Sequence, residues 1–326
     1  MDIHVQLNTE FKVNQGSTLP SRIRHNFGGV AYNITHALHL LGNSSVRLLT
    51  VSGRTTTFQN DESNLSVIEE IPNENTASYV SILDAKTNEL ICGLGDMGIY
   101  ERQINREFFE KYRSFLTKSQ WIMFDANLSC SAMKDLTMMG NELNKYLVFI
   151  SAGGPEKARR IRPYLSSIDV LLCNRLEFQS ISDSSSIETA LDRMMKSNPR
   201  LKLISITMGA DGVLIGNDRT IKHYRALKIN ENEKNQIENV TGAGDSFAAG
   251  LMNYLLKFDW QNLDRAVTCG LLAAKFTLTS PNTISDRLKT IDKKLIDEIC
   301  SKELRYELIH FEQTPIRNES SFSVID

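Results

Sequence analysis

The chain has 326 residues, of which 41% are hydrophobic and 23% are charged, so it is long enough to bury a large core and is not a mini-protein. Lys and Arg total 37 against 39 Asp and Glu, and this balance excludes a protein that coats nucleic acid through a global positive field. No window approaches the roughly 18 to 20 apolar residues of a membrane span, and the first residues lack the pattern of a secretory signal. We therefore expect a soluble, cytoplasmic protein with neither nucleic acid nor membrane as a partner.

The N-terminal third predicts a small sheet that stands apart from the main core. Residues 3–13 alternate apolar and polar side chains, as a strand with one exposed face does. Residues 76–84 and 89–97 flank a short polar stretch and predict a hairpin. Between these segments, residues 55–64 are polar and indicate a loop.

From residue 103 onward, helical and strand patterns alternate. The expected strands are 121–127, 146–151, 168–174, 202–209 and 211–217, and the expected helices include 131–143, 156–165 and 186–196. Such alternation predicts a parallel sheet covered by helices on both faces, with ligand sites at the carboxyl ends of the strands. The tail 313–326 is polar and is expected to be dispensable for chemistry.

The strongest local signal is the run NVTGAGD, residues 239–245, which leads directly into an apolar helical stretch. Glycines ahead of a helix let backbone N–H groups converge on an anion, and the helix dipole adds to that attraction. Asp245 would lie in the first turn of the helix. There it either caps the helix or accepts a proton from a substrate hydroxyl, and the spacing favours neither role.

A second signal is GGVAYN, residues 28–33, which also leads into a helix. By itself the glycine pair indicates a turn before a helix. In the functional interpretation, Gly28 and Gly29 let the backbone approach a ligand closely, and Asn33 offers a donor and an acceptor to sugar hydroxyls.

In this order, the two motifs resemble the two signatures of the PfkB, or ribokinase, family of sugar and nucleoside kinases. Three further segments resemble motifs of the family: Asn174 to Glu177 its N-x-x-E, residues 207–212 its T-x-G-x-x-G turn, and residues 125–127 its D-x-N segment. The resemblance implies a ribokinase-like three-layer α/β/α sandwich with a mainly parallel central sheet. The kinase domain would span residues 1–312, and strands 3–13 and 76–97 would form a small β-sheet lid.

Within the family, the chain is most similar to the pseudouridine kinases, on GGVAYN, NVTGAGD and the segment TASYVSILD. This similarity implies transfer of the γ-phosphoryl group of ATP to the 5′-hydroxyl of pseudouridine. The alternatives are a kinase for another nucleoside or sugar and a catalytically silent ligand-binding paralogue.

The resemblance also implies a role for each matching residue. Asp245 would be the base, and the N–H groups of Gly242, Ala243 and Gly244 would form the anion hole. Glu177, with Asn174, would hold Mg²⁺ through water, and a monovalent cation such as K⁺ would assist. The substrate would contact Asp2, Gly28, Gly29, Asn33 and Asn127, and ATP would contact Asn174, Thr207, Gly209, Gly212 and Thr241. Thr76 and Tyr79 either face the nucleoside or serve β-propensity alone.

Two departures from the family pattern concern the start of the chain. Family members begin with an apolar core strand, and Met1 stands where that strand should already be ending, so we expect a missing first core strand. Residues 54–75 also look too few for the usual helix, strand and connection. An incomplete chain, one half of a fusion with a pseudouridine-phosphate glycosidase, and a degenerating paralogue are the competing explanations.

Two surface features complete the expectations. The apolar face of the lid sheet is a plausible surface for a homodimer. The basic run Lys157, Arg159, Arg160 and Arg162 is expected to be a solvated helix face rather than an RNA surface, because neither interleaved aromatic residues nor a basic overall charge accompanies it.

Overall fold

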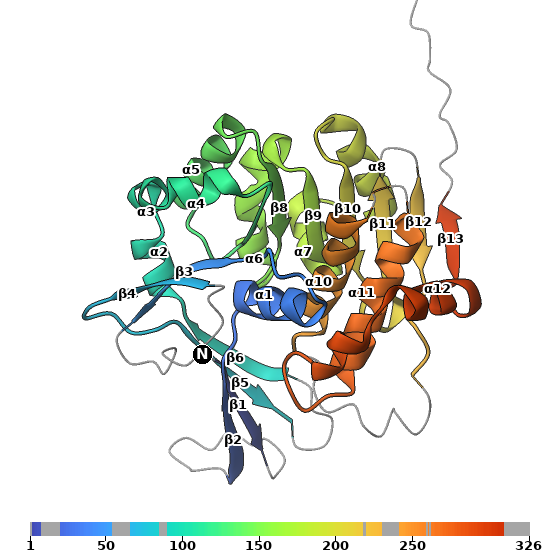
Figure 1. The fold of residues 1–326 in the computed structure, drawn as a ribbon, viewed down its shortest axis with the longest axis horizontal. Coiled ribbons are helices and arrows are strands. Elements are labelled where there is room, and N and C mark those ends of the chain that lie inside the picture. Colours follow the sequence, from blue (N-terminus) through green and yellow to red (C-terminus); the bar gives the residue numbers. More distant parts are fainter. Residues whose placement is uncertain are drawn as a thin grey trace, which may run out of the picture.

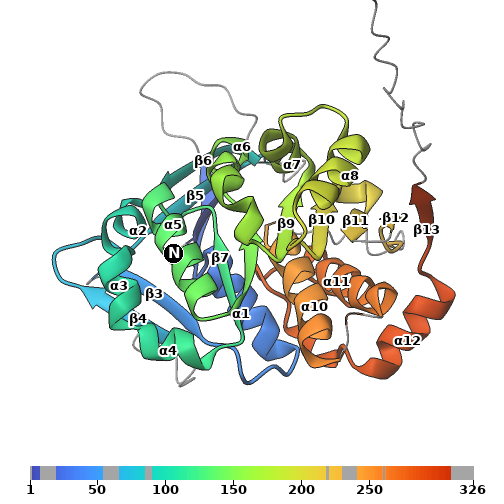
Figure 2. The same cartoon turned by 90° about the horizontal axis from the view of Figure 1, so that it is seen from above.

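The computed structural model describes residues 2–7, 20–53, 66–84, 90–217, 220–229, 241–258, 260 and 262–309. These residues build a central sheet with a helical layer on each face, and a smaller sheet projects from one end of this body (Figures 1 and 2). The three-layer α/β/α arrangement expected from the sequence is therefore confirmed. The predicted loop 55–64 and the polar tail 313–326 lie outside the described residues.

The central sheet has seven strands in the order β13-β12-β11-β10-β9-β8-β7. In chain order they are β7 (Trp121–Asp125), β8 (Tyr146–Ile150), β9 (Val170–Asn174), β10 (Leu203–Thr207), β11 (Val213–Asn217), β12 (Ile221–Tyr224) and β13 (Tyr306–Ile309). Strands β7 to β10 run parallel, while β11, β12 and β13 extend the sheet with antiparallel pairings. The continuous apolar runs predicted the first five strands; the short β12 and β13 were not expected.

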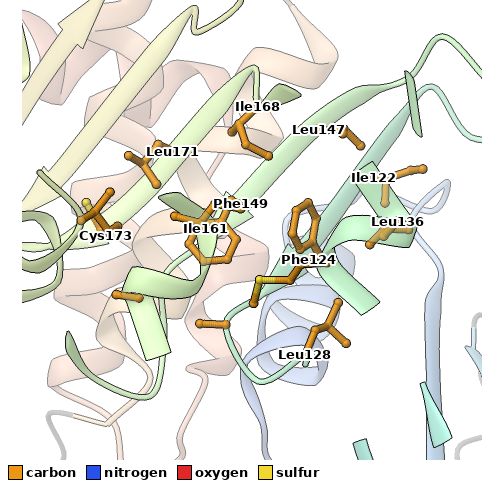
Figure 3. Packing of buried hydrophobic residues seen from close by; sticks show 14 of the residues in the cluster. Ile122, Phe124, Leu128, Leu136, Leu147, Phe149, Ile161, Ile168, Leu171 and Cys173 are labelled. Atoms are coloured by element: carbon orange, nitrogen blue, oxygen red, sulfur yellow. The ribbon is translucent and has the colours of Figure 1, made fainter. Parts of the chain in front are cut away.

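The two faces of the sheet bury separate apolar clusters, because successive side chains of a strand point to opposite faces. On β8, Leu147 and Phe149 belong to one cluster and Val148 to the other. Figure 3 shows the first cluster, in which Phe124 of β7 and Phe149 pack together with ring centroids 5.5 Å apart. Buried strands covered on both faces explain why these segments are almost wholly apolar.

One helical layer contains α3 (Arg106–Lys111), α5 (Cys130–Glu142), α7 (Arg175–Ser182) and α8 (Ile187–Ser197), and the other contains α1 (Val30–Leu40), α10 (Ala243–Lys257), α11 (Leu263–Leu278) and α12 (Lys293–Lys302). Shorter helices are α2 (Gly98–Gln103), α4 (Arg113–Lys118) and α6 (Pro155–Ala158). The helix expected over 156–165 is α-helical only in α6 and continues as a 3₁₀ helix over 159–167. This tighter segment contains Pro163, which has no N–H to donate.

The projecting lid sheet has the strand order β2-β1-β5-β6. It comprises β1 (Asp2–Leu7), β2 (Ser21–Asn26) and the predicted hairpin, β5 (Ser78–Leu83) with β6 (Leu90–Asp96). Residues 8–13 of the expected first strand lie outside the described residues. Strand β2, with the sequence SRIRHN, was missed because it is largely exposed and polar. Ile23 and Leu94 are exposed on this sheet, and the homodimer stays a prediction.

A third, two-stranded sheet pairs β3 (Leu48–Gly53) in parallel with β4 (Ser66–Ile71). A strand therefore does fit between residues 54 and 75, where the sequence looked too short; residues 54–65 are not described. Within the described part of the chain, β3 pairs only with β4, and β7 pairs only with β8. One edge of each strand is thus left without a strand partner.

Across the described ranges, no helix is both long enough and apolar enough to cross a membrane.

Candidate active site

A cavity of about 1400 Å³ lies where the lid sheet, α1, β3, β7 and the start of α10 meet. The seven residues expected to bind substrate all line it, together with Thr241, which was expected to contact ATP, and Asp245. The seven are Asp2, Gly28, Gly29, Asn33, Thr76, Tyr79 and Asn127. Segments more than 200 residues apart in the sequence therefore converge on one space.

Asp245 lies in the first turn of α10 and contacts the second glycine motif directly. The side-chain amide of Asn33 donates a 2.8 Å hydrogen bond to Oδ2 of Asp245. Burial, followed by the negative charges of Asp125, Asp2 and Glu177, raises the pKa of Asp245 to about 7, although the hydrogen bond from Asn33 opposes this shift. A carboxylate with such a pKa is well suited to accept a proton near neutral pH. A raised pKa and a place in the cavity are both properties that a base would need.

The backbone ahead of Asp245 takes a shape that requires glycine. Gly242 precedes α10 with φ of 84°, and a Cβ at this position would lie 2.0 Å from the carbonyl oxygen of Thr283. By contrast, a Cβ added at Gly244 would meet no atom within 4 Å. Open space therefore lies beside Gly244, in the first turn of the helix, the end at which an anion is favoured. Ala243 is the first residue of α10, between the two glycines.

The first glycine motif packs against the start of the lid. A Cβ on Gly28 would lie 1.7 Å from Oδ2 of Asp2, so only glycine leaves room for this carboxylate. The N–H of Gly29, whose φ is 101°, donates to the same carboxylate. Burial raises the pKa of Asp2. The pair thus positions an acidic group in the wall of the cavity, where it can accept hydrogen bonds from a ligand's hydroxyls.

The two lid residues whose roles were open differ in what they contact. Tyr79 is the register partner of Asp2 in the parallel pair β1–β5, and it lines the cavity. Its ring lies against Gly93, where a Cβ would be 2.3 Å from the hydroxyl. The hydroxyl of Thr76 accepts from the N–H of Gly53 at 2.9 Å and so ties the lid to β3. Tyr79 is thus available to a ligand, while Thr76 has a structural contact.

Sequence reasoning missed Lys157 as a site residue. Lys157 lines the cavity, and its Nζ donates a 2.8 Å hydrogen bond to Oδ1 of Asn127. The N–H of Asn127 in turn donates to Asp125 at 2.7 Å. Burial lowers the pKa of Lys157. The signal that could have identified it is the preceding Gly153-Gly154 pair, a turn after β8 comparable to the other glycine motifs.

The prediction that the basic run at residues 157–162 is a solvated helix face therefore holds only in part. Arg159 is largely exposed, but Arg160 donates to the carbonyl oxygen of Leu128 at 3.2 Å, and Arg162 donates to that of Ile181 at 2.9 Å. The last two arginines hold neighbouring segments together.

The N-x-x-E segment forms a capping box at the start of α7. Oδ1 of Asn174 accepts from the N–H of Glu177 at 2.9 Å, and Oε2 of Glu177 accepts from the N–H of Asn174 at 3.0 Å. Glu177 is 3% exposed, and burial raises its pKa. Both side chains lie outside the set that lines the cavity, although the charge of Glu177 acts on Asp245.

The T-x-G-x-x-G segment lies beside the N-x-x-E segment. Thr207 at the end of β10 is the register partner of Asn174 at the end of β9. Gly209 and Gly212 have φ of 62° and 97°, and a Cβ on Gly212 would lie 2.1 Å from the carbonyl oxygen of Tyr224. These groups therefore extend the site along the carboxyl ends of the strands, as expected for an α/β fold.

The donor set is compatible with Mg²⁺ only through water. Among the described residues, no group of three or more His, Cys, Asp or Glu side chains could hold a metal ion. Asn174 and Glu177 already engage each other, but the carboxyl groups of Asp125 and Glu177 lie close enough to act on that of Asp245. Mg²⁺ prefers oxygen ligands and keeps several of its waters, which agrees with such an arrangement.

Residues 1–291 match the model of the pfkB family of carbohydrate kinases. The chain belongs to this family. This pfkB-family chain is similar in sequence to the pseudouridine kinase of Escherichia coli. The two are 30% identical over 73% of this chain and 76% of that protein. A pseudouridine-metabolizing bifunctional protein of Schizosaccharomyces pombe is 24% identical over 85% of this chain, which covers 44% of that protein.

Solved structures confirm the ribokinase-like fold of this pfkB kinase. The ribokinase of Giardia lamblia superposes with a TM-score of 0.74 at 18% identity, over 92% of this chain and 96% of that one. A nucleoside kinase of Burkholderia thailandensis in complex with inosine gives 0.64 at 17% identity, over 92% and 95%. At these identities the likeness concerns the fold alone.

Proposed function

We propose that this pfkB-family kinase transfers the γ-phosphoryl group of ATP to the 5′-hydroxyl of pseudouridine, giving pseudouridine 5′-phosphate and ADP. The kinase chemistry rests chiefly on the hydrogen-bonded pair of Asn33 and Asp245 in the cavity. The choice of nucleoside is supported by the 30% identity to the Escherichia coli pseudouridine kinase.

In the proposed reaction, the unprotonated Asp245 accepts the proton of the 5′-hydroxyl as that oxygen bonds to the γ-phosphorus. The bond between this phosphorus and the bridging oxygen of ADP then breaks. The pKa of about 7 means that the base form is present at neutral pH while the carboxyl can still hold the transferred proton. Asn33 fixes the carboxylate so that it is oriented before the substrate binds.

Phosphoryl transfer depends mainly on positioning and on stabilising charge. We assign the transferred phosphoryl group to the open space in front of Gly244, where the N–H groups of residues 242–244 and the α10 dipole favour an anion. ATP would extend from there past Thr241 toward Thr207, Gly209 and Gly212. Mg²⁺, when bound through waters of Asn174 and Glu177, would neutralise phosphate charge beside the nearby carboxylates. A monovalent cation and a fused glycosidase stay predictions.

The sugar would lie between the lid and α1. Asp2 and Asn33 would take its hydroxyls, and the backbone at Gly28 and Gly29 would allow close approach. Asn127 and Tyr79 would contact the nucleoside from opposite sides of the cavity.

The test is ADP formation by the purified chain with ATP and Mg²⁺, using pseudouridine, uridine, adenosine and ribose as acceptors. We expect the highest kcat/KM with pseudouridine. Asp245→Asn should lower turnover roughly 10²- to 10⁴-fold, whereas Asp183→Asn, a matched change at an exposed left-handed position, should leave turnover unchanged. Preference for another acceptor would reject pseudouridine, and full activity of Asp245→Asn would reject the base.

A further inference from the structure

A second, smaller cavity lies at the opposite end of α10 from Asp245. Its volume of about 390 Å³ falls within the range of about 300 to 1000 Å³ that is usual for small-molecule sites. Its walls come from α10, α11 and α12, which lie side by side in one helical layer (Figures 1 and 2). Because a helix rises about 1.5 Å per residue, Lys257 in the wall lies about 18 Å along α10 from Asp245. We call this space the helix-end cavity.

The helix-end cavity is lined by three cationic side chains and one carboxylate. The cations are Lys257, Arg265 and Lys293, and the carboxylate is Asp297. Asp297 accepts a hydrogen bond from Nε of Arg265, so these two charges balance each other. Within the part of the chain that the structure describes, neither lysine has an ion-pair partner. The cavity is therefore locally positive in a chain whose formal net charge is -2, and it favours an anion.

A buried hydroxyl adds a directional group to the helix-end cavity. Tyr254 lines the cavity and is only 3% exposed. Burial raises the pKa of Tyr254, and the charges of Arg265 and Asp297 act on the same hydroxyl, which therefore lies near the charged wall. Among the described residues this hydroxyl has no hydrogen-bond partner, although buried tyrosine hydroxyls usually find one. An oxygen of a ligand in the cavity would supply that partner.

One wall of the helix-end cavity is aromatic and open to solvent. Phe258, directly after α10, is 54% exposed, and its ring centroid lies 4.8 Å from that of Tyr254. An exposed ring offers a face on which a planar ring of a ligand can stack. The cavity thus combines a site for an anion with a site for a flat, apolar group.

The charge of the helix-end cavity matches a phosphate monoester better than a carboxylate. A phosphate monoester carries about −1.5 to −2 charges near pH 7 and offers three acceptor oxygens. It would balance both Lys257 and Lys293, whereas a carboxylate would balance only one of them. Lys257 donates to the carbonyl oxygen of Leu41 at 2.8 Å. An ammonium group has three N–H donors, so Lys257 keeps donors for a ligand.

We propose that the helix-end cavity binds a phosphate monoester that carries a planar ring, such as a nucleoside 5′-phosphate. The phosphate group lies between Lys257, Lys293 and the hydroxyl of Tyr254, and the ring stacks on Phe258. This site is distinct from the place assigned to the transferred phosphoryl group at the start of α10. The inference goes beyond the proposed function and does not depend on which acceptor the kinase uses.

The test is isothermal titration calorimetry on the purified full chain, without ATP or Mg²⁺, so that no turnover occurs. The probes are uridine 5′-phosphate, ribose 5-phosphate and inorganic phosphate. We expect saturable binding that is tightest for uridine 5′-phosphate, because only this probe has both the phosphate group and a planar ring. Raising the salt concentration should weaken the binding of all three probes, since their charges are screened.

Variants locate the bound probe, because Lys293, Tyr254 and Phe258 line the helix-end cavity and not the catalytic one. Lys293→Met should raise the Kd for uridine 5′-phosphate roughly tenfold or more, since it removes a hydrogen bond between charged groups. Tyr254→Phe should raise this Kd roughly three- to tenfold. Phe258→Ala should remove the preference for uridine 5′-phosphate over ribose 5-phosphate. Lys294→Met, at an exposed neighbour outside the cavity lining, is the matched control and should keep the original Kd.

Four results would overturn the proposal. The first is the absence of saturable binding of uridine 5′-phosphate. The second is an unchanged Kd in both Lys293→Met and Tyr254→Phe, which would place the probe elsewhere, the catalytic cavity included. The third is an equal rise of the Kd in Lys294→Met, which would indicate a general charge effect. The fourth is inorganic phosphate binding as tightly as uridine 5′-phosphate, which would exclude a site for the ring. None of these readouts needs turnover, so a failure of the proposed function would leave them unaffected.

Discussion

Lys157 belongs to a chain of hydrogen bonds that links Asn127, which is proposed to contact the nucleoside, to the end of β7. Its ammonium group donates to Asn127, whose N–H is held by Asp125 at the end of β7. A charged donor that is partly buried and lines the cavity has few solvent contacts to lose when a ligand arrives. We therefore interpret Lys157 as a positioning residue that holds the Asn127 amide toward the nucleoside.

We expect Lys157→Met to raise the KM for the nucleoside roughly tenfold or more, because a hydrogen bond to a charged group contributes about 1.5 to 3 kcal/mol. The kcat should change less, since Asp245 and the start of α10 are untouched. Lys134→Met on the exposed side of α5 is the matched control. Steady-state kinetics with the nucleoside varied would check this. An unchanged KM in Lys157→Met would remove the residue from the site.

At the level of single elements, two glycines at the start of α10, Gly242 and Gly244, differ in the reason that a side chain is absent. Gly242 is required by the fold, because of its positive φ and the nearby carbonyl oxygen of Thr283. Gly244 meets no neighbour that would exclude a side chain. Packing therefore does not explain its lack of a side chain, and we propose that ligand binding does.

Gly242→Ala should therefore lower the stability by more than the roughly 1 to 3 kcal/mol of backbone strain alone. Gly244→Ala should fold with an unchanged or higher melting temperature, because alanine favours a helix over glycine. Its turnover should nevertheless fall, since the methyl group occupies the space assigned to the phosphoryl group. Thermal melting and ADP formation, measured on both variants, distinguish these effects. Normal turnover in Gly244→Ala would place the phosphoryl group elsewhere.

The start of α7 poses a similar question, because the capping box by itself accounts for Asn174 and Glu177. Gln can replace Glu in such a box, so Glu177→Gln should keep the melting temperature. If the carboxylate also organises Mg²⁺, this variant should need a higher Mg²⁺ concentration for half-maximal rate. Glu177→Ala, which loses half of the box, should in addition lose roughly 0.5 to 2 kcal/mol of stability. A wild-type Mg²⁺ dependence in Glu177→Gln would leave the motif with a purely structural role.

At the level of the whole molecule, the cavity and its immediate surroundings hold carboxyl groups whose burial opposes their ionisation. Burial raises the pKa of Asp2, Asp125 and Glu177, and that of Asp245 reaches about 7. A carboxyl whose pKa is higher in the folded than in the unfolded state stabilises the fold fully only below its ordinary pKa near 4. This contribution is lost as the pH rises through the folded pKa.

The melting temperature of the chain should therefore fall between pH 5 and pH 8, the range in which Asp245 ionises. Asp245→Asn cannot ionise at this position, so its melting temperature should decline less over the same range. At pH 8 the variant should be the more stable of the two proteins. Differential scanning calorimetry at both pH values would show this, and parallel declines would mean that Asp245 is not strained by its charge. The buried Asp245 carboxyl, whose raised pKa suits its proposed role as a base, is thus expected to lower the stability of the fold once it is ionised.

Local sequence determined the alternating strands and helices of the central sheet, the hairpin of the lid and the two glycine motifs. These features depend on periodicity and on backbone conformations that only glycine adopts readily, so they can be predicted within a short window. The same window missed β2, because it is polar. It also assigned Lys157 to a solvated face, because the exposed charged residues around it give no sign that it is partly buried.

The tertiary structure determined which segments that are distant in the sequence contact one another. Asn33 and Asp245 are 212 positions apart, and only the packing of α1 against α10 brings their side chains to 2.8 Å. The pKa of Asp245, the exclusion of any side chain at Gly28 by Asp2, and the cavity itself likewise arise from contacts between distant segments. The sequence by itself thus determined the fold class and the chemistry of its motifs, because both depend on local pattern. Only the fold decided which groups share one cavity, because burial and charge act through space.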